Sequence, residues 1–130
     1  MKSLFLTIFA VSLSFSVSFA QQDEQLDNVK AAMKAGSAKE LAKFLSESVD
    51  LNLDNNQNTY SKSQAEFVLR DFFKANPVAD FTILHKGSSK SGQPYAIGQY
   101  KSGADKYRVF MKFKLVASQQ LIHEISFSKE

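Results

Sequence analysis

The chain has 130 residues, a formal net charge of +3 and no cysteine. This length suits one domain with a single hydrophobic core. A chain without cysteine forms no disulfide and offers no thiol for a lipid anchor, so the core alone must hold the fold. The mild positive charge gives no sign of a nucleic-acid partner.

The amino terminus has the three-part pattern of a secretory signal peptide. Lys2 supplies a positive charge, residues 4–19 carry none, and Ala20 precedes a polar stretch. Small residues at the end of such a run are what signal peptidase reads. The alternative is a retained membrane span, but serines dilute this run, and a spanning helix needs about 20 strongly apolar residues. We predict that residues 1–20 are cleaved and that residues 21–130 form one exported domain, periplasmic or secreted, without a transmembrane span.

Three segments have the apolar spacing of amphipathic helices. The first follows Gln22, the second begins at Ser37, and the third, the most aromatic, covers residues 61–76. Ser37 and Ser61 are each followed three residues later by Glu or Gln, which is the pattern of a capping box. Pro77 ends the third helix, because proline disfavours helical geometry in the residue before it.

Five segments alternate apolar and polar residues with the period of strands. They are residues 49–53, 81–85, 95–100, 107–115 and 121–127. We expect a polar turn at residues 55–58 and short connections between the last four strands. Gly98, in the middle of a predicted strand, favours a bulge or a bend. The predicted class is α+β, in the order α-α-β-α-β-β-β-β.

This order resembles the nuclear-transport-factor-like cone, also called the cystatin-like fold, in which a curved antiparallel sheet wraps around a long helix. The aromatic helix at residues 61–76 and the strand at residues 107–115 are similar to an exported bacterial domain-of-unknown-function family within that superfamily. The resemblance extends over residues 23–128. The resemblance implies a fold and a location in the cell envelope. It implies no established activity.

Enzymes of this superfamily place acids and hydroxyls in the mouth between sheet and helices, as ketosteroid isomerase does. His85, Tyr95 and His123 are the polar residues predicted to face that space, and they are the pocket candidates for acid–base work or ligand binding. Histidines of this kind are more often hydrogen-bonded core residues. The enclosed faces otherwise offer no Asp or Glu, so the enzymes' acid–base set has no counterpart and no catalytic residue is predicted.

Residues 50–58 carry oxygen side chains at alternate positions, like the first half of a calcium-binding loop. Asn55 stands where that loop needs glycine, and Ser61 stands where it needs a bidentate glutamate. A strand that enters a polar turn is a sufficient explanation of the segment. We therefore predict no metal and no cofactor.

The outer side of the strand at residues 107–115 is basic and partly aromatic. Phe110, Lys112 and Lys114 are predicted to lie on that side together with Ile122 of the last strand, and these four are the interface candidates. Charges there usually mean a solvated sheet face. Apolar groups on an outer sheet face often mark a contact surface, so dimerisation through this face is our hypothesis.

The sequence is compatible with two functions. The first is a non-enzymatic module that binds an unknown protein or a small apolar ligand. The alternative is a small-ligand carrier or a ketosteroid-isomerase-like enzyme that uses the cone pocket, which requires an open cavity between the long helix and the sheet. Phe72, Phe73 and Phe113 are bulky enough to fill that space instead.

Overall fold

The computed structural model describes residues 17–130, with side chains from residue 24 onward. The predicted signal peptide falls mainly on residues 1–16, which lie outside this range. The described residues form the helices α1 (Val17–Ala35), α2 (Ala38–Ala42) and α3 (Lys62–Ala75). They also form the strands β1 (Leu45–Leu53), β2 (Asn56–Ser61), β3 (Asp80–Ser88), β4 (Pro94–Ser102), β5 (Asp105–Val116) and β6 (Gln119–Lys129).

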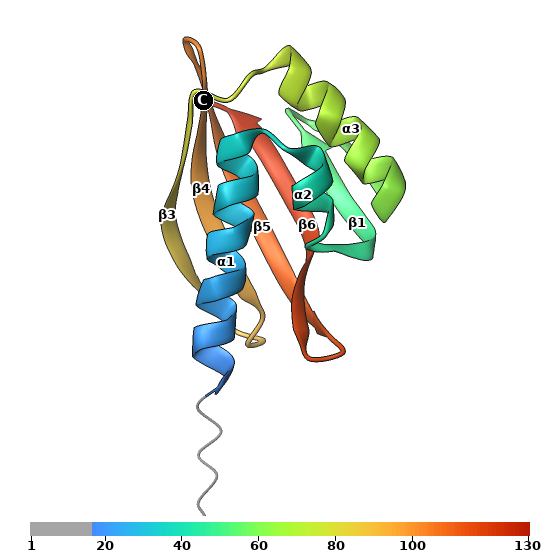
Figure 1. Ribbon diagram of the computed structural model, residues 1–130, viewed down its shortest axis with the longest axis vertical. Coiled ribbons are helices and arrows are strands. Elements are labelled where there is room, and N and C mark those ends of the chain that lie inside the picture. Colours follow the sequence, from blue (N-terminus) through green and yellow to red (C-terminus); the bar gives the residue numbers. More distant parts are fainter. Residues whose placement is uncertain (1–16) are drawn as a thin grey trace, which may run out of the picture.

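The strands form one sheet in the order β2-β1-β6-β5-β4-β3. β1 and β6 pair in parallel, and the other neighbouring pairs are antiparallel. The helices lie on one face of the curved sheet, which we call the inner face, and leave the opposite, outer face uncovered (Figure 1). The α+β class and the predicted order are confirmed, and the structure adds β2 where the sequence predicted a polar turn.

β2 is an edge strand of polar residues. Its hairpin with β1 turns at Asp54 and Asn55, whose φ angles of 48° and 73° are both positive. Such a two-residue turn matches the twist of a hairpin, and Asp and Asn tolerate this backbone. Thr59 Oγ1 donates a hydrogen bond to Asp50 Oδ1 at 2.6 Å across the pair. Most of β2 is exposed, so its sequence lacks the apolar alternation by which strands are recognised.

α1 is longer than predicted, because it begins at Val17 rather than after Gln22. The predicted cleavage point after Ala20 therefore lies within its first turn. Val29 and Met33 of this helix are fully buried. No helix within residues 17–130 is both long and apolar enough to cross a membrane.

The sequence signals at both ends of α3 are confirmed. The Ser61 side chain accepts a hydrogen bond from the Gln64 backbone N–H at 3.3 Å, and the Gln64 side chain accepts one from the Ser61 N–H at 3.1 Å. This reciprocal pair satisfies two backbone donors that a helix start otherwise leaves open. At the other end the Asn76 N–H donates to the Phe72 carbonyl, immediately before Pro77.

α3 packs its aromatic side on the inner face of the sheet. Five buried residues form an aromatic cluster, namely Phe72, Phe73, Tyr100, Tyr107 and Phe127. Their ring centroids lie between 4.6 Å, for Phe72 and Phe127, and 6.4 Å, for Phe73 and Phe127. These separations are those at which aromatic rings attract one another. The aromatic cluster fills the space between α3 and the inner face.

Two β-bulges change which residues reach each face. Between β3 and β4 the register shifts at Leu84, and His85 pairs with Ile97 on the outer face. Between β6 and β5 the register shifts at His123, because Glu124 and Ile122 pair with consecutive residues of β5. An extra residue reverses the facing of all residues on one side of it. The predicted alternation of β3 and β6 therefore holds on one side of each bulge only.

Candidate functional site

The outer face has an aromatic and aliphatic centre. One row across the paired strands consists of Asn52, Ser126, Phe110, Ile97 and His85, and the next row contains Asp50, Glu124, Lys112 and Tyr95. Residues directly opposite each other in paired strands share a face. Tyr95, Ile97 and Phe110 are half-buried, although no helix covers them. The three side chains thus shield one another within an uncovered surface.

His85, Tyr95 and Phe110 form what we call the aromatic strip. The ring centroids of His85 and Tyr95 are 5.8 Å apart, and those of Tyr95 and Phe110 are also 5.8 Å apart. His85 Nε2 lies 3.3 Å from the Tyr95 hydroxyl, within hydrogen-bond distance. Lys112 Nζ lies 5.7 Å from the centre of the Phe110 ring, in the range of a cation–π contact. The strip crosses three adjacent strands of the outer face.

Gly87 gives the Tyr95 ring its position. The two residues are opposite each other in β3 and β4. A Cβ atom at position 87 would lie 3.0 Å from the Tyr95 hydroxyl oxygen and 3.1 Å from the ring carbon that bears it. The aromatic ring therefore lies over the glycine, which is a known way to protect a glycine in a strand.

Ion pairs border the aromatic strip. Lys112 Nζ lies 3.3 Å from Glu124 Oε2, and Arg108 Nε lies 3.1 Å from Glu130 Oε1. Pairs with this much exposure to water stabilise a fold only weakly. Their main effect is to place charges of both signs on the surface around Phe110.

His123 lies at the bulge of β6 with partners of its own. Its Nε2 is 2.7 Å from Nε2 of Gln93, the residue immediately before β4. Burial lowers the pKa of His123 below its ordinary value of 6.5, and Glu124 opposes this shift while Lys114 and Lys112 add to it. The three pocket candidates therefore do not converge, because His85 contacts Tyr95 and His123 contacts Gln93.

The predicted placement of three candidates needs correction. Tyr95 was expected on the enclosed face, but it lies on the outer face in the row of Lys112 and Glu124. His85 was expected on the enclosed face, but the bulge at Leu84 turns it to the outer face beside Tyr95. Ile122 was expected on the outer face, but the bulge at His123 turns it inward, and it is fully buried. Of the other interface candidates, Phe110 and Lys112 lie on the outer face as predicted, and Lys114 is exposed near the end of β5.

Sequence reasoning missed a polar contact inside the cone. The hydroxyls of Tyr100 and Tyr107 donate to the backbone carbonyl and the side-chain oxygen of Asn76, at the end of α3. Burial, and secondly Tyr107, raise the pKa of Tyr100 to about 12. The signal was present, because a buried tyrosine needs a partner for its hydroxyl, and both tyrosines alternate with apolar neighbours. Both hydroxyls are engaged in holding α3 to the sheet.

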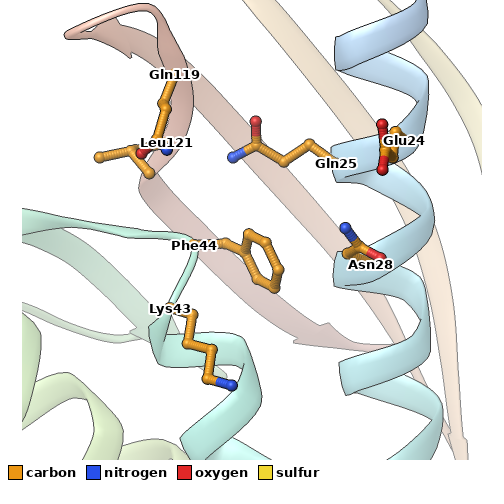
Figure 2. A pocket seen from close by; sticks show the side chains of 7 residues that line it. All are labelled: Glu24, Gln25, Asn28, Lys43, Phe44, Gln119 and Leu121. Atoms are coloured by element: carbon orange, nitrogen blue, oxygen red, sulfur yellow. The ribbon is translucent and has the colours of Figure 1, made fainter.

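A small cleft lies at the other end of the inner side, between α1 and the turn of β5 and β6 (Figure 2). Its volume is about 220 Å³. It is lined by Glu24, Gln25, Asn28, Lys43, Phe44, Gln119 and Leu121. The Gln25 side chain reaches from α1 across the cleft and donates to the Gln120 carbonyl. Among the described residues, no three His, Cys, Asp or Glu side chains gather as metal ligands would.

Comparisons with solved structures agree with the fold. A DUF4783 family protein from Bacteroides uniformis is 30% identical with a TM-score of 0.75, and the match covers 80% of this chain and 95% of that one. An NTF2-like protein of unknown function from Shewanella baltica is 11% identical with a TM-score of 0.66, covering 86% and 93%. A domain with a cystatin-like fold from Nostoc punctiforme is 8% identical with a TM-score of 0.67, covering 88% and 78%.

The last two likenesses are of fold alone, and they confirm the nuclear-transport-factor-like, cystatin-like architecture. No curated protein matches the sequence. Residues 26–128, which include nearly the whole sheet, α2, α3 and the buried part of α1, match the family Domain of unknown function (DUF4783). The chain belongs to the DUF4783 family.

Proposed function

We propose that this protein is an exported, non-catalytic interaction module that associates with a second copy of itself through the outer face of the sheet. One observation carries the proposal. The aromatic strip and Ile97 extend from the edge strand β3 to the central strand β5, on a sheet face that no helix covers. Contiguous apolar groups on such a face, bordered by charges, are typical of a contact surface.

The packing of the interior supports an outer working surface. A carrier or an enzyme that uses the cone would hold its ligand between α3 and the inner face. The aromatic cluster fills this space, and Asn76 engages the hydroxyls of Tyr100 and Tyr107. The polar and aromatic groups that remain available, His85 and Tyr95 among them, lie outside.

The pattern of residues on the outer face suits a two-fold dimer. The midline of the sheet runs between β5 and β6. A two-fold axis along that midline exchanges these strands, so Lys112 of one copy faces Glu124 of the second copy, and Phe110 faces Ser126. Sheets that pack face to face lie about 10 Å apart, a gap that side chains from both sheets fill. Opposite charges and large beside small side chains favour this arrangement.

Substitution of Phe110 by lysine tests the proposed dimer. We expect residues 21–130 of the natural sequence to have twice the monomer mass by light scattering, and Phe110→Lys to have the monomer mass with unchanged circular dichroism. The matched control is Phe67→Lys, since Phe67 is 61% exposed on α3, away from the outer face. A natural chain of monomer mass, or a Phe110→Lys chain of dimer mass, would count against the proposal.

Export is the second part of the proposal, and the pattern of residues 1–20 supports it. We expect the chain recovered from an envelope or culture-medium fraction to begin at Gln21 when its intact mass is measured. A chain that keeps residues 1–20 and stays in the cytoplasmic fraction would contradict export without affecting the dimer.

A further inference from the structure

The turn between β5 and β6 ends in an unusually apolar tip. Among the side chains that the structure describes, the exposed large apolar residues are Phe67, Leu84, Leu115 and Val116. Leu115 and Val116 are consecutive, with exposed fractions of 66% and 40%. Consecutive residues of a strand point to opposite faces, so the tip is apolar on both sides.

The tip is also narrow. Val116 and Gln119 are the last pair of the hairpin, and the two residues between them, Ala117 and Ser118, have φ angles of 48° and 68°. Both φ angles are positive, as in the tightest two-residue hairpin turn. A contact with a flat protein surface would cover one side of such a tip. An apolar medium that surrounds the tip covers both sides.

The tip lies at the same end of the molecule as the start of α1 (Figure 1). α1 begins at Val17 at this end, and the turn of β5 and β6 lies at the same end (Figure 1). The hydrogen bond from the Gln25 side chain to the Gln120 carbonyl fixes the first half of α1 beside the hairpin.

The charges at this end favour an anionic partner. The turn between β3 and β4 points the same way (Figure 1). The two hairpins contribute Lys90 and Lys114, and they contain no acid in residues 81–104 or 106–123. Glu24 of α1 lines the cleft beside the tip. Lysines around an aliphatic tip are the combination by which peripheral proteins bind anionic lipid.

We infer that the β5–β6 tip docks on a membrane surface, with Leu115 and Val116 among the acyl chains and the lysines at anionic headgroups. This goes beyond the proposed self-association, and it rests on the proposed export for its setting. The tip is separate from the aromatic strip, so one chain can use both surfaces. Among the described side chains the buried core lies between Val29 and Phe127, and residues 21–130 contain it.

A single tryptophan reports whether the tip enters lipid. The chain has no tryptophan, so Leu115→Trp in residues 21–130 provides the only indole signal. We expect its emission to shift to shorter wavelength with phosphatidylglycerol vesicles and to stay unchanged with phosphatidylcholine vesicles. Phe67→Trp, on α3, is the matched reporter and should not respond to either. An unchanged Leu115→Trp spectrum with phosphatidylglycerol, or equal shifts from both reporters, overturns the inference.

Vesicle sedimentation measures the contribution of the tip to affinity. We expect Leu115→Glu with Val116→Glu to weaken binding to phosphatidylglycerol vesicles at least about tenfold, since it replaces two apolar contacts by charge repulsion. Phe67→Glu should bind as the natural chain does. Equal binding by the double variant and the natural chain would contradict membrane docking. Docking would also be contradicted if the natural chain did not sediment with the vesicles and the double variant lost the dimer mass, because the tip would then be a protein contact. Since residues 21–130 are made without the signal, neither result depends on export.

Discussion

At the scale of single residues, Asn76 holds the end of α3 to the inner face of the sheet. Its side chain and backbone carbonyl accept hydrogen bonds from Tyr107 and Tyr100, while its own N–H groups donate to the Phe72 carbonyl. One residue therefore ends α3 and satisfies two buried hydroxyls. A buried hydroxyl without a partner costs about 1–3 kcal/mol, which explains why an asparagine at the helix end is useful here.

His123 makes the stability of the fold depend on pH. Burial lowers its pKa below 6.5, so the unfolded chain binds more protons than the folded chain as the pH falls through that value. The contribution of His123 to stability is present above 6.5 and is lost below it. We expect the urea midpoint of the natural chain to fall between about pH 7.5 and about pH 5.5, and that of His123→Gln to fall less.

Glutamine is the appropriate replacement because it keeps a group that can bond to Gln93 and does not titrate. An equal fall for both proteins would show that other groups carry the pH dependence.

The facing of His85 and Ile122 could not be predicted from the sequence. Each residue lies one position from a bulge. Consecutive apolar residues, Ile83-Leu84 and Leu121-Ile122, interrupt the alternation near each bulge, but they do not show which residue is the extra one. A bulge is defined by the pairing of two strands, because two residues of one strand lie opposite one residue of the other. The sequence of one strand alone therefore does not locate it. Gly98 illustrates the same point, because the bulge that it suggested lies opposite, in β3. At Gly98 itself, the ring of Phe81 from β3 occupies the space that a side chain would take.

At the scale of elements, two hairpins use the same turn with different residues. Asp54 and Asn55 make the turn of β1 and β2, and Ala117 and Ser118 make the turn of β5 and β6. Positive φ angles suit Asn, Asp and Gly, whereas alanine pays for them in steric strain. The second turn is therefore a strained feature at the tip that we assign to the membrane.

Replacement of the second turn by Asn-Gly should stabilise the protein. We expect Ala117→Asn with Ser118→Gly to raise the free energy of unfolding by about 1 kcal/mol, because both new residues favour the φ angles that the turn already has. Urea denaturation measures the change. Asn55→Gly is the matched control and should gain less, since asparagine already tolerates its φ of 73°. A destabilised Asn-Gly variant would mean that Ala117 or Ser118 makes contacts beyond the backbone.

The helices and long strands were predictable because their apolar period reflects one buried side. The capping box and the spacing of the aromatic residues predict α3, and the long alternation of apolar and polar residues predicts β5. β2 was missed because it pairs at the edge with polar side chains. The aromatic strip was also beyond prediction as a unit, since its residues come from β3, β4 and β5, and the bulge at Leu84 is needed to bring His85 to it.

At the scale of the whole molecule, the fold separates three regions. The inner face and α3 enclose the aromatic cluster, which holds the domain together. The outer face presents the aromatic strip. The end that carries the start of α1 presents the tip of β5 and β6. A membrane contact at one end leaves the outer face free, so docking and self-association are compatible in one assembly.

The proposed use of the outer face is tested most directly by cross-linking at its centre. The chain has no cysteine, so Ser126→Cys is the only thiol in the variant, and Ser126 pairs with Phe110 beside the sheet midline. A bismaleimide with a reach of about 10 Å spans two sheets that pack face to face. We predict a covalent dimer from Ser126→Cys and none from Ser63→Cys, an exposed position on α3. Equal yields from both variants, or no dimer from Ser126→Cys, would contradict association through the outer face.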